Sequence, residues 1–112
     1  MKTRVLLAIT LLTGPWHAQA AEPDSHVRVL AASCAACHGP GGNSVGGTPV
    51  LAGLDRSHFV TQMKAFRSGA RASTVMHRHA KGLTEPEIEQ LADYFSVQPR
   101  ATAASLLPLK DF

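Results

Sequence analysis

Large aromatic side chains are scarce in this 112-residue chain, which has one Trp, one Tyr and four Phe. The single tryptophan, Trp16, falls in an N-terminal segment that we expect to be removed. Small domains bury proportionately little surface, and many recruit a disulfide, a metal or a cofactor. We therefore expect something other than side chains to fill part of the core.

The chain also lacks a long apolar run after its first residues. A membrane-spanning helix needs about 20 apolar residues, and no stretch beyond residue 20 approaches that length. Residues 1–20 have a basic start, an apolar run at 5–12 and the small-residue sequence AQA at 18–20, as in a secretory signal peptide. We expect cleavage after this segment and export to the periplasm; an uncleaved N-terminal anchor is the alternative.

No strong excess of charge of one sign is present. The full chain has 11 Lys and Arg against 8 Asp and Glu. Lys2 and Arg4 would leave with the signal peptide, so the mature chain would carry a net charge of about +1. Composition thus gives no reason to expect a nucleic-acid partner.

Strand patterns and internal repeats are absent, and the apolar residues recur with helical spacing. Helices are predicted over residues 27–37, 55–67 and 84–97. The glycine-rich segment 39–49 and the basic segment 70–83 have no period and are expected to be irregular. These features predict one all-α domain of three to five short helices at residues 21–98, followed by a tail at 99–112.

Local signals mark the boundaries of the second and third predicted helices. Asp55 is a suitable N-cap, and Gly69 is a suitable stop. Thr84 and Glu87 form a capping box, and Pro86 occupies the tolerated first turn. The starts of these two helices are therefore predicted by residue type as well as by apolar pattern.

The only two cysteines, Cys34 and Cys37, are three residues apart, and His38 follows them directly. A disulfide at this spacing closes almost no loop, so it would stabilise the fold little. A thioredoxin-like dithiol belongs in a βαβ setting that this sequence lacks, and a zinc site needs two further paired ligands. These three interpretations are therefore disfavoured.

The remaining interpretation is one covalently bound haem c. In such a site each thiol adds to a vinyl group of the porphyrin, and the adjacent histidine ligates the iron from one face. Cys34 and Cys37 would place both sulfurs along one edge of the macrocycle, with His38 at the metal. The haem would also supply the missing part of the core.

The second axial ligand is expected to be a methionine, because thioether ligation raises the iron potential and suits an electron carrier. Met63 lies between Phe59 and Phe66 on an apolar helix face and is better explained as core. Met76 lies in the irregular segment before the last helix, and a loop there can fold back over the haem. Met76 is therefore the predicted ligand.

Histidines near Met76 are the alternative ligands. His77 and His79 can each be proposed, although with Arg78 they are more simply explained as an exposed basic rim. His58 is explained as a helix-surface residue. Iron with two axial protein ligands has no open position for a substrate, so the domain is expected to transfer electrons and to have no catalytic residue.

Over residues 27–97 the chain resembles the class I c-type cytochromes. The sequences CAACHG, then TPVLAG at 48–53, then TVMHRHAKGLTEPEIEQLADYF at 74–95 occur in that family's order and spacing. The resemblance implies the small all-α cytochrome c fold, in which the first and last helices cross. Leu91 and Tyr94 match positions where the last helix packs on the first.

The resemblance also implies a set of site residues. Cys34 and Cys37 would carry the haem, and His38 and Met76 would be the axial ligands. The carbonyl of Pro49 would accept a hydrogen bond from the ring of His38. Such a contact fixes the imidazole and tunes the metal.

Within this family the chain is similar to the cytochrome subunit of flavocytochrome c sulfide dehydrogenase, in HGPGGNSVG and FRSGARASTVMHRHAKGLTEPEIEQLADYF. It is also similar to one half of cytochrome c4, notably in GNS, LAG and FRSGAR. Those proteins occur in two-haem forms, whereas this chain has a single CxxCH. It would correspond to a single-haem version of either.

The resemblance implies an electron-transfer subunit in the periplasm. An FAD-containing partner subunit would oxidise sulfide and pass electrons singly to this haem, which would reduce a soluble acceptor. The sequences SVGGTPVLAG at 44–53 and AASLLPL at 103–109 are candidate contacts with such a partner.

The alternative is a free-standing shuttle of the c4 or c553 type in a respiratory chain. Such a shuttle docks transiently with several partners, and basic side chains can attract those that are acidic. Four basic residues surround the proposed ligand segment: Arg67, Arg71, Arg78 and Lys81.

Overall fold

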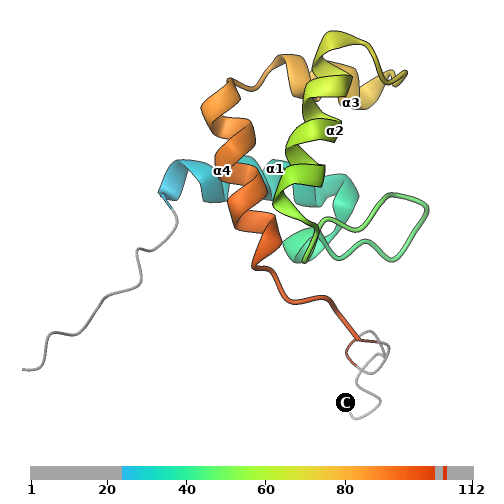
Figure 1. Ribbon diagram of the computed structural model, residues 1–112. Coiled ribbons are helices and arrows are strands. Elements are labelled where there is room, and N and C mark those ends of the chain that lie inside the picture. The colour runs from blue at the N-terminus through green and yellow to red at the C-terminus, as the bar shows by residue number, and fades with distance from the viewer. Residues whose placement is uncertain (1–23, 103–104, 106–112) are drawn as a thin grey trace, which may run out of the picture.

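A computed structural model describes residues 24–102 and 105 (Figure 1). They form four α-helices, α1 (Ser25–His38), α2 (Arg56–Ser68), α3 (Val75–Lys81) and α4 (Glu85–Ser96), and one 3-10 turn, η1 (Pro40–Gly42). No strand occurs among these residues, so the all-α prediction is confirmed. The expected signal peptide and residues 103–104 and 106–112 of the tail lie outside the described part.

The three predicted helices are present as α1, α2 and α4. Asp55 caps α2, with its carboxylate accepting from the backbone N–H of His58, and α2 ends at Gly69 with a left-handed φ of 81°. Both hydrogen bonds of the Thr84–Glu87 capping box open α4. Helix α1 runs one residue beyond its predicted end, so that His38 is still helical.

One expectation is wrong, because part of the segment predicted to be irregular forms α3. The sequence of this seven-residue helix, VMHRHAK, has no apolar stripe, and Ala80 is its only buried residue. The hydroxyl of Ser73 accepts a hydrogen bond from the backbone N–H of Met76 in its first turn. Met76 therefore lies on a helix and not on a loop.

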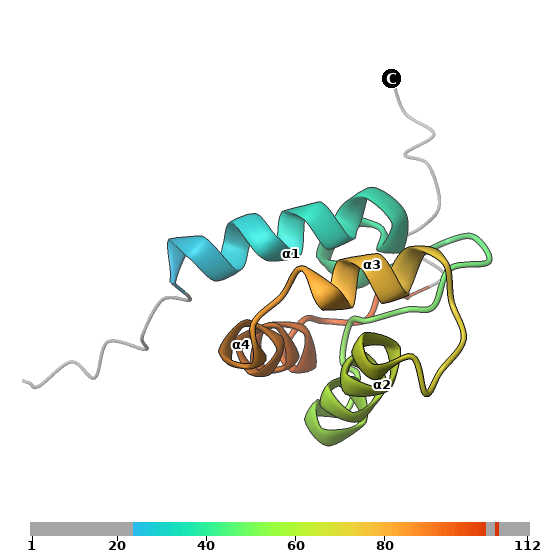
Figure 2. The ribbon, with the colours of Figure 1, turned by 90° about the horizontal axis from the view of Figure 1, so that it is seen from above.

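The core lies where α2 and α4 run side by side in opposite directions, with α1 crossing them (Figures 1 and 2). The rings of Phe59 on α2 and Phe95 on α4 have centroids 5.8 Å apart. Ile88 and Leu91, on the same side of α4, are fully buried. Tyr94 is half-buried and meets Phe95 edge-on.

The glycine-rich loop after α1 is closed by backbone contacts. The carbonyl of Gly42 accepts hydrogen bonds from the N–H groups of Leu51 and Ala52, at 2.8 and 3.2 Å. Gly42 has a φ of 80°, and a Cβ there would lie 2.8 Å from the Cβ of Leu51. This closure brings together the two ends of the loop formed by residues 43–50.

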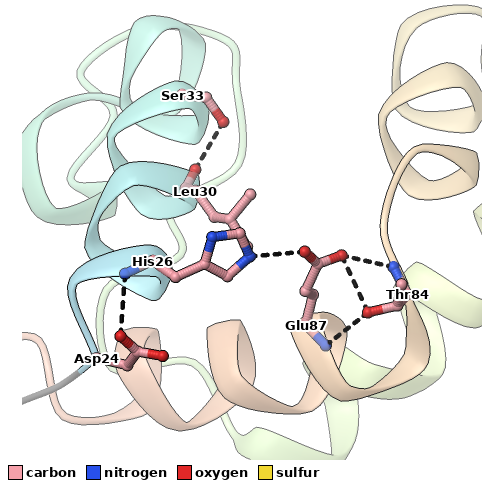
Figure 3. A network of polar contacts seen from close by, with 6 residues as sticks. All are labelled: Asp24, His26, Leu30, Ser33, Thr84 and Glu87. Carbon is pink, nitrogen blue, oxygen red and sulfur yellow. Dashed lines mark hydrogen bonds and ion pairs between the residues drawn. The ribbon is translucent and has the colours of Figure 1, made fainter.

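Charged side chains join the helices on the surface. Glu87 accepts from the ring of His26 at 2.7 Å and from the backbone N–H of Thr84 at 2.7 Å, which ties the start of α1 to the start of α4 (Figure 3). Arg56 on α2 pairs with Glu89 and Asp93 on α4. These pairs occupy the surface along α4.

None of the helices within residues 24–102 has the length and the apolar character of a membrane-spanning helix.

Candidate functional site

Residues from the C-terminal half of α1 and from α3 border a hollow in the structure. Its cavity volume is about 90 Å³. Side chains from all four helices and two connecting segments line it: Leu30, Ser33, Cys34, Cys37, His38, Leu51, Phe59, Met63, Val75, Met76, His79, Leu83 and Leu91. A second opening shares seven of these residues and extends the hollow to Pro49 and Phe66.

His38 is the one buried polar residue in the described chain, at 8% exposure. Its Nδ1 lies 2.7 Å from the carbonyl oxygen of Pro49. Because a carbonyl only accepts, Nδ1 carries the hydrogen, and in the neutral ring Nε2 keeps its lone pair. This is the contact that the resemblance implies, and it leaves the other ring nitrogen of His38 available to bind a metal.

Pro49 reaches His38 because of the loop closure at Gly42. The side chain of Asn43 extends this closure to the residues after α4, donating to the carbonyl of Pro99 at 3.0 Å and accepting from the N–H of Ala101 at 2.7 Å. The backbone N–H of Gly53 also donates to the carbonyl of Phe95 at 2.9 Å. The loop is thus fixed at both ends, and the role of Asn43 had no signal in the sequence beyond its position in GNS.

Both cysteines are free thiols and line the hollow. Burial raises the pKa of the Cys34 thiol above its usual value of 9.0, and its Sγ lies 3.4 Å from the carbonyl of Leu30. Cys37 is exposed. Reactive dithiols and thiolate metal sites have a lowered cysteine pKa, so the environment of Cys34 does not favour these alternatives.

Two methionine side chains reach the hollow. Met76 is half-buried on α3, and Met63 on α2 is buried at 6% exposure. Met63 and Met76 each line the hollow and its second opening. Met63 therefore packs in the core, as its pattern predicted, and also borders the site, which the pattern did not indicate.

The alternative histidine ligands are placed differently from one another. The Nδ1 of His77 lies 2.6 Å from the carbonyl oxygen of Phe66 on α2, and His77 lines neither opening. Its interpretation as an exposed rim residue is wrong, because this contact draws the half-buried ring onto α2. His79 is exposed and lines the hollow, and His58 is exposed and lines the second opening, as expected of surface residues.

The donor set and the lining of the hollow fit a haem c. Two thiols and an imidazole with a free Nε2 come from the end of α1, and a thioether comes from α3. Most of the other lining residues are apolar, as suits a macrocycle. None of the described carboxylates lines the hollow or its second opening.

Comparisons with known proteins show the family to which the chain belongs. The family described as "Cytochrome C oxidase, cbb3-type, subunit III" matches residues 21–95. The chain is 44% identical to the cytochrome subunit of sulfide dehydrogenase of Chlorobaculum tepidum, over 74% of this chain and 77% of that protein.

Two other relatives are longer than this chain. It is 41% identical to the thiosulfate dehydrogenase electron acceptor of Thiomonas intermedia, over 83% of this chain and 43% of that protein. It is also 41% identical to cytochrome c4 of Thiocapsa roseopersicina, over 64% of this chain and 38% of that protein. The aligned region thus spans less than half the length of these two proteins.

Proposed function

Because the chain belongs to the c-type cytochrome family and has the small all-α fold of class I, we propose that it transfers single electrons through one covalent haem c. Cys34 and Cys37 would hold the macrocycle as thioethers, and His38 and Met76 would bind its iron. The contact between His38 Nδ1 and the Pro49 carbonyl, at 2.7 Å, carries this proposal. It presents Nε2 of a buried imidazole beside two free thiols.

A bound haem c supplies the iron that accepts and releases one electron. The side chains of this chain set the conditions for that exchange. Donation from His38 to Pro49 orients the imidazole and raises its basicity. A thioether from Met76 favours the reduced iron and raises the potential. Phe59 and Leu91 keep water from one side of the hollow, because both are buried.

The ligand assignment is tested by comparing two methionine variants of the holoprotein. Met76→Ala should lose the long-wavelength absorption band that arises from methionine bound to ferric iron. Met63→Ala should keep the band, because Met63 is proposed only to pack against the site. Absence of the band in the unmodified protein, or its loss in Met63→Ala alone, would overturn the assignment of Met76.

We further propose that the electron donor is an FAD-containing sulfide dehydrogenase subunit in the periplasm. The support is the 44% identity to a cytochrome subunit of sulfide dehydrogenase, most of whose length this chain covers. Two exposed apolar residues are suited to a permanent interface: Val75, which is 57% exposed and lines the hollow beside Met76, and Val45, which is 81% exposed in the loop that carries Pro49. Apolar residues are characteristic of such interfaces.

Native purification tests this partnership directly. Haem and flavin absorbance should co-elute in one peak from the producing cells. Val75→Glu, at a valine that lines the hollow, should separate the two, whereas Val29→Glu, at a valine of α1 that is 69% exposed and does not line the hollow, should leave them together. Elution of the haem chain without flavin, from cells that contain both proteins, would reject the permanent complex.

A second candidate function, a free-standing shuttle, is supported by the distribution of charge. The hollow and its second opening are bordered by the basic residues His58, Arg71 and His79 and by no described carboxylate. Such a surface attracts acidic partners with a strongly salt-dependent association rate. A rate of electron transfer to acidic acceptors that does not change between low and high salt would argue against this candidate.

A further inference from the structure

The helix that carries Met76 depends on tertiary contacts for its position. Helix α3 has seven residues, and isolated helices shorter than about 12 to 15 residues are marginal in water. Ala80 is its only buried side chain. Contacts of α3 with neighbouring elements must therefore determine where the Met76 side chain lies.

The most specific of these contacts joins His77 to α2. The Nδ1 of His77 lies 2.6 Å from the carbonyl oxygen of Phe66. A carbonyl only accepts, so His77 donates. Phe66 is in the last turn of α2, where four carbonyls have no partner within the helix. Among the described residues, the carbonyl of Phe66 also accepts from the N–H of Gly69, at 3.2 Å.

The connection between the two helices is attached to the same residue. The guanidinium of Arg71 lies 4.5 Å from the centre of the Phe66 ring, and the backbone N–H of Arg71 donates to the carbonyl of Ala65 at 3.0 Å. The Arg71 side chain also donates to Gln62. The end of α2 therefore holds both α3 and the segment that leads into it.

We propose that His77 is a positioning residue that keeps Met76 directed at the haem pocket. Consecutive residues of a helix point about 100° apart, so fixing the ring of His77 on α2 also fixes the direction of the Met76 side chain. The bond from His77 to Phe66 opposes any movement of α3 away from the hollow. This inference rests on the proposed role of Met76 as an iron ligand.

The test measures how readily the iron becomes accessible in the ferric holoprotein. Cyanide binds only the fraction of molecules from which the methionine has left, so its apparent affinity reports that fraction. Loss of a net hydrogen bond worth about 0.5–1.5 kcal/mol corresponds to a factor of roughly 2 to 10. His77→Ala should therefore bind cyanide about 2- to 10-fold more tightly and lose its methionine absorption band at a lower temperature.

Three further variants separate positioning from general stability. His77→Asn should bind cyanide as weakly as the unmodified protein does. The amide N–H₂ of asparagine is as many bonds from the backbone as Nδ1 of histidine, so it can donate the same hydrogen bond. Arg78→Ala removes the exposed neighbouring side chain of α3 and should leave the affinity unchanged. If His77→Ala yields no holoprotein, His77→Phe keeps a ring without a donor and should show the same increase.

Particular results would overturn the proposal. Unchanged cyanide affinity in His77→Ala or His77→Phe would do so, even if the denaturation midpoint fell, because the role would then be structural only. An equal increase in Arg78→Ala would also reject it. A wrong assignment of Met76 would appear separately, as absence of the methionine band in the unmodified protein.

Discussion

Replacing Gly42 by alanine should strongly destabilise the holoprotein. Its φ of 80° is a left-handed conformation that costs a non-glycine residue about 1–2 kcal/mol. The new Cβ would also lie 2.8 Å from the Cβ of Leu51, 2.9 Å from the backbone nitrogen of Ala52 and 3.0 Å from the ring of Phe95. Overpacking of this kind costs about 1–3 kcal/mol, so the total loss should be about 2–5 kcal/mol.

Urea-induced unfolding followed by far-UV circular dichroism measures this loss. Unfolding of small proteins has a slope of about 1–3 kcal/mol per molar urea. With a slope of about 2, the Gly42→Ala midpoint should fall by roughly 1 to 2.5 M. Part of the effect arises because Ala52 contributes a backbone atom, which cannot rotate away as a flexible side chain can.

Gly46→Ala is the matched control in the same loop. A Cβ at Gly46 meets nothing within 4 Å, and the residue has no positive φ. Alanine there should be neutral or should stabilise by up to about 1 kcal/mol, by restricting the unfolded chain. Equal midpoints for Gly42→Ala and the unmodified protein would refute the reasoning, because the loop would then open without cost.

Three further predictions concern packing, haem attachment and pH. Met63→Ala should lower the free energy of unfolding by about 2–5 kcal/mol, because Met63 is 6% exposed; a urea-measured loss below about 1 kcal/mol would contradict this packing. His38→Ala should abolish stable holoprotein, and a wild-type haem spectrum in that variant would reject the site. Hydrogen bonds, first from the backbone N–H of Thr84 and next from His26, lower the pKa of Glu87 from 4.5 to about 2. The stabilisation of the fold by ionised Glu87 is complete above pH 4.5 and is lost as the pH falls through about 2. Glu87→Gln should therefore flatten the acid limb of a curve of unfolding free energy against pH. An unchanged acid limb would contradict this role of Glu87.

Much of the fold follows from local signals in the sequence. The caps at Asp55 and Thr84 determine where α2 and α4 begin, and both rely on side chains within three residues of the backbone groups they bind. Burial of Phe59 and Leu91 follows from their place on apolar stripes. Such features are predictable because the interacting groups are neighbours in the chain.

Helix α3 could not be predicted in this way. Its sequence has no apolar period, and the contact that fixes it joins His77 to Phe66, 11 residues away on another helix. The approach of Pro49 to His38 likewise depends on the backbone closure at Gly42. A family resemblance indicated that contact, but no pattern of residue types did.

The contact between His26 and Glu87 joins residues 61 positions apart, so it can form only after the chain has been synthesised as far as α4. Both cysteines precede α4 by about 50 residues, so the thiols are synthesised well before the helix that completes the core. In the folded chain, burial raises the pKa of the Cys34 thiol and makes it less reactive. Completion of the core around this thiol therefore waits for α4, the last helix of the described residues.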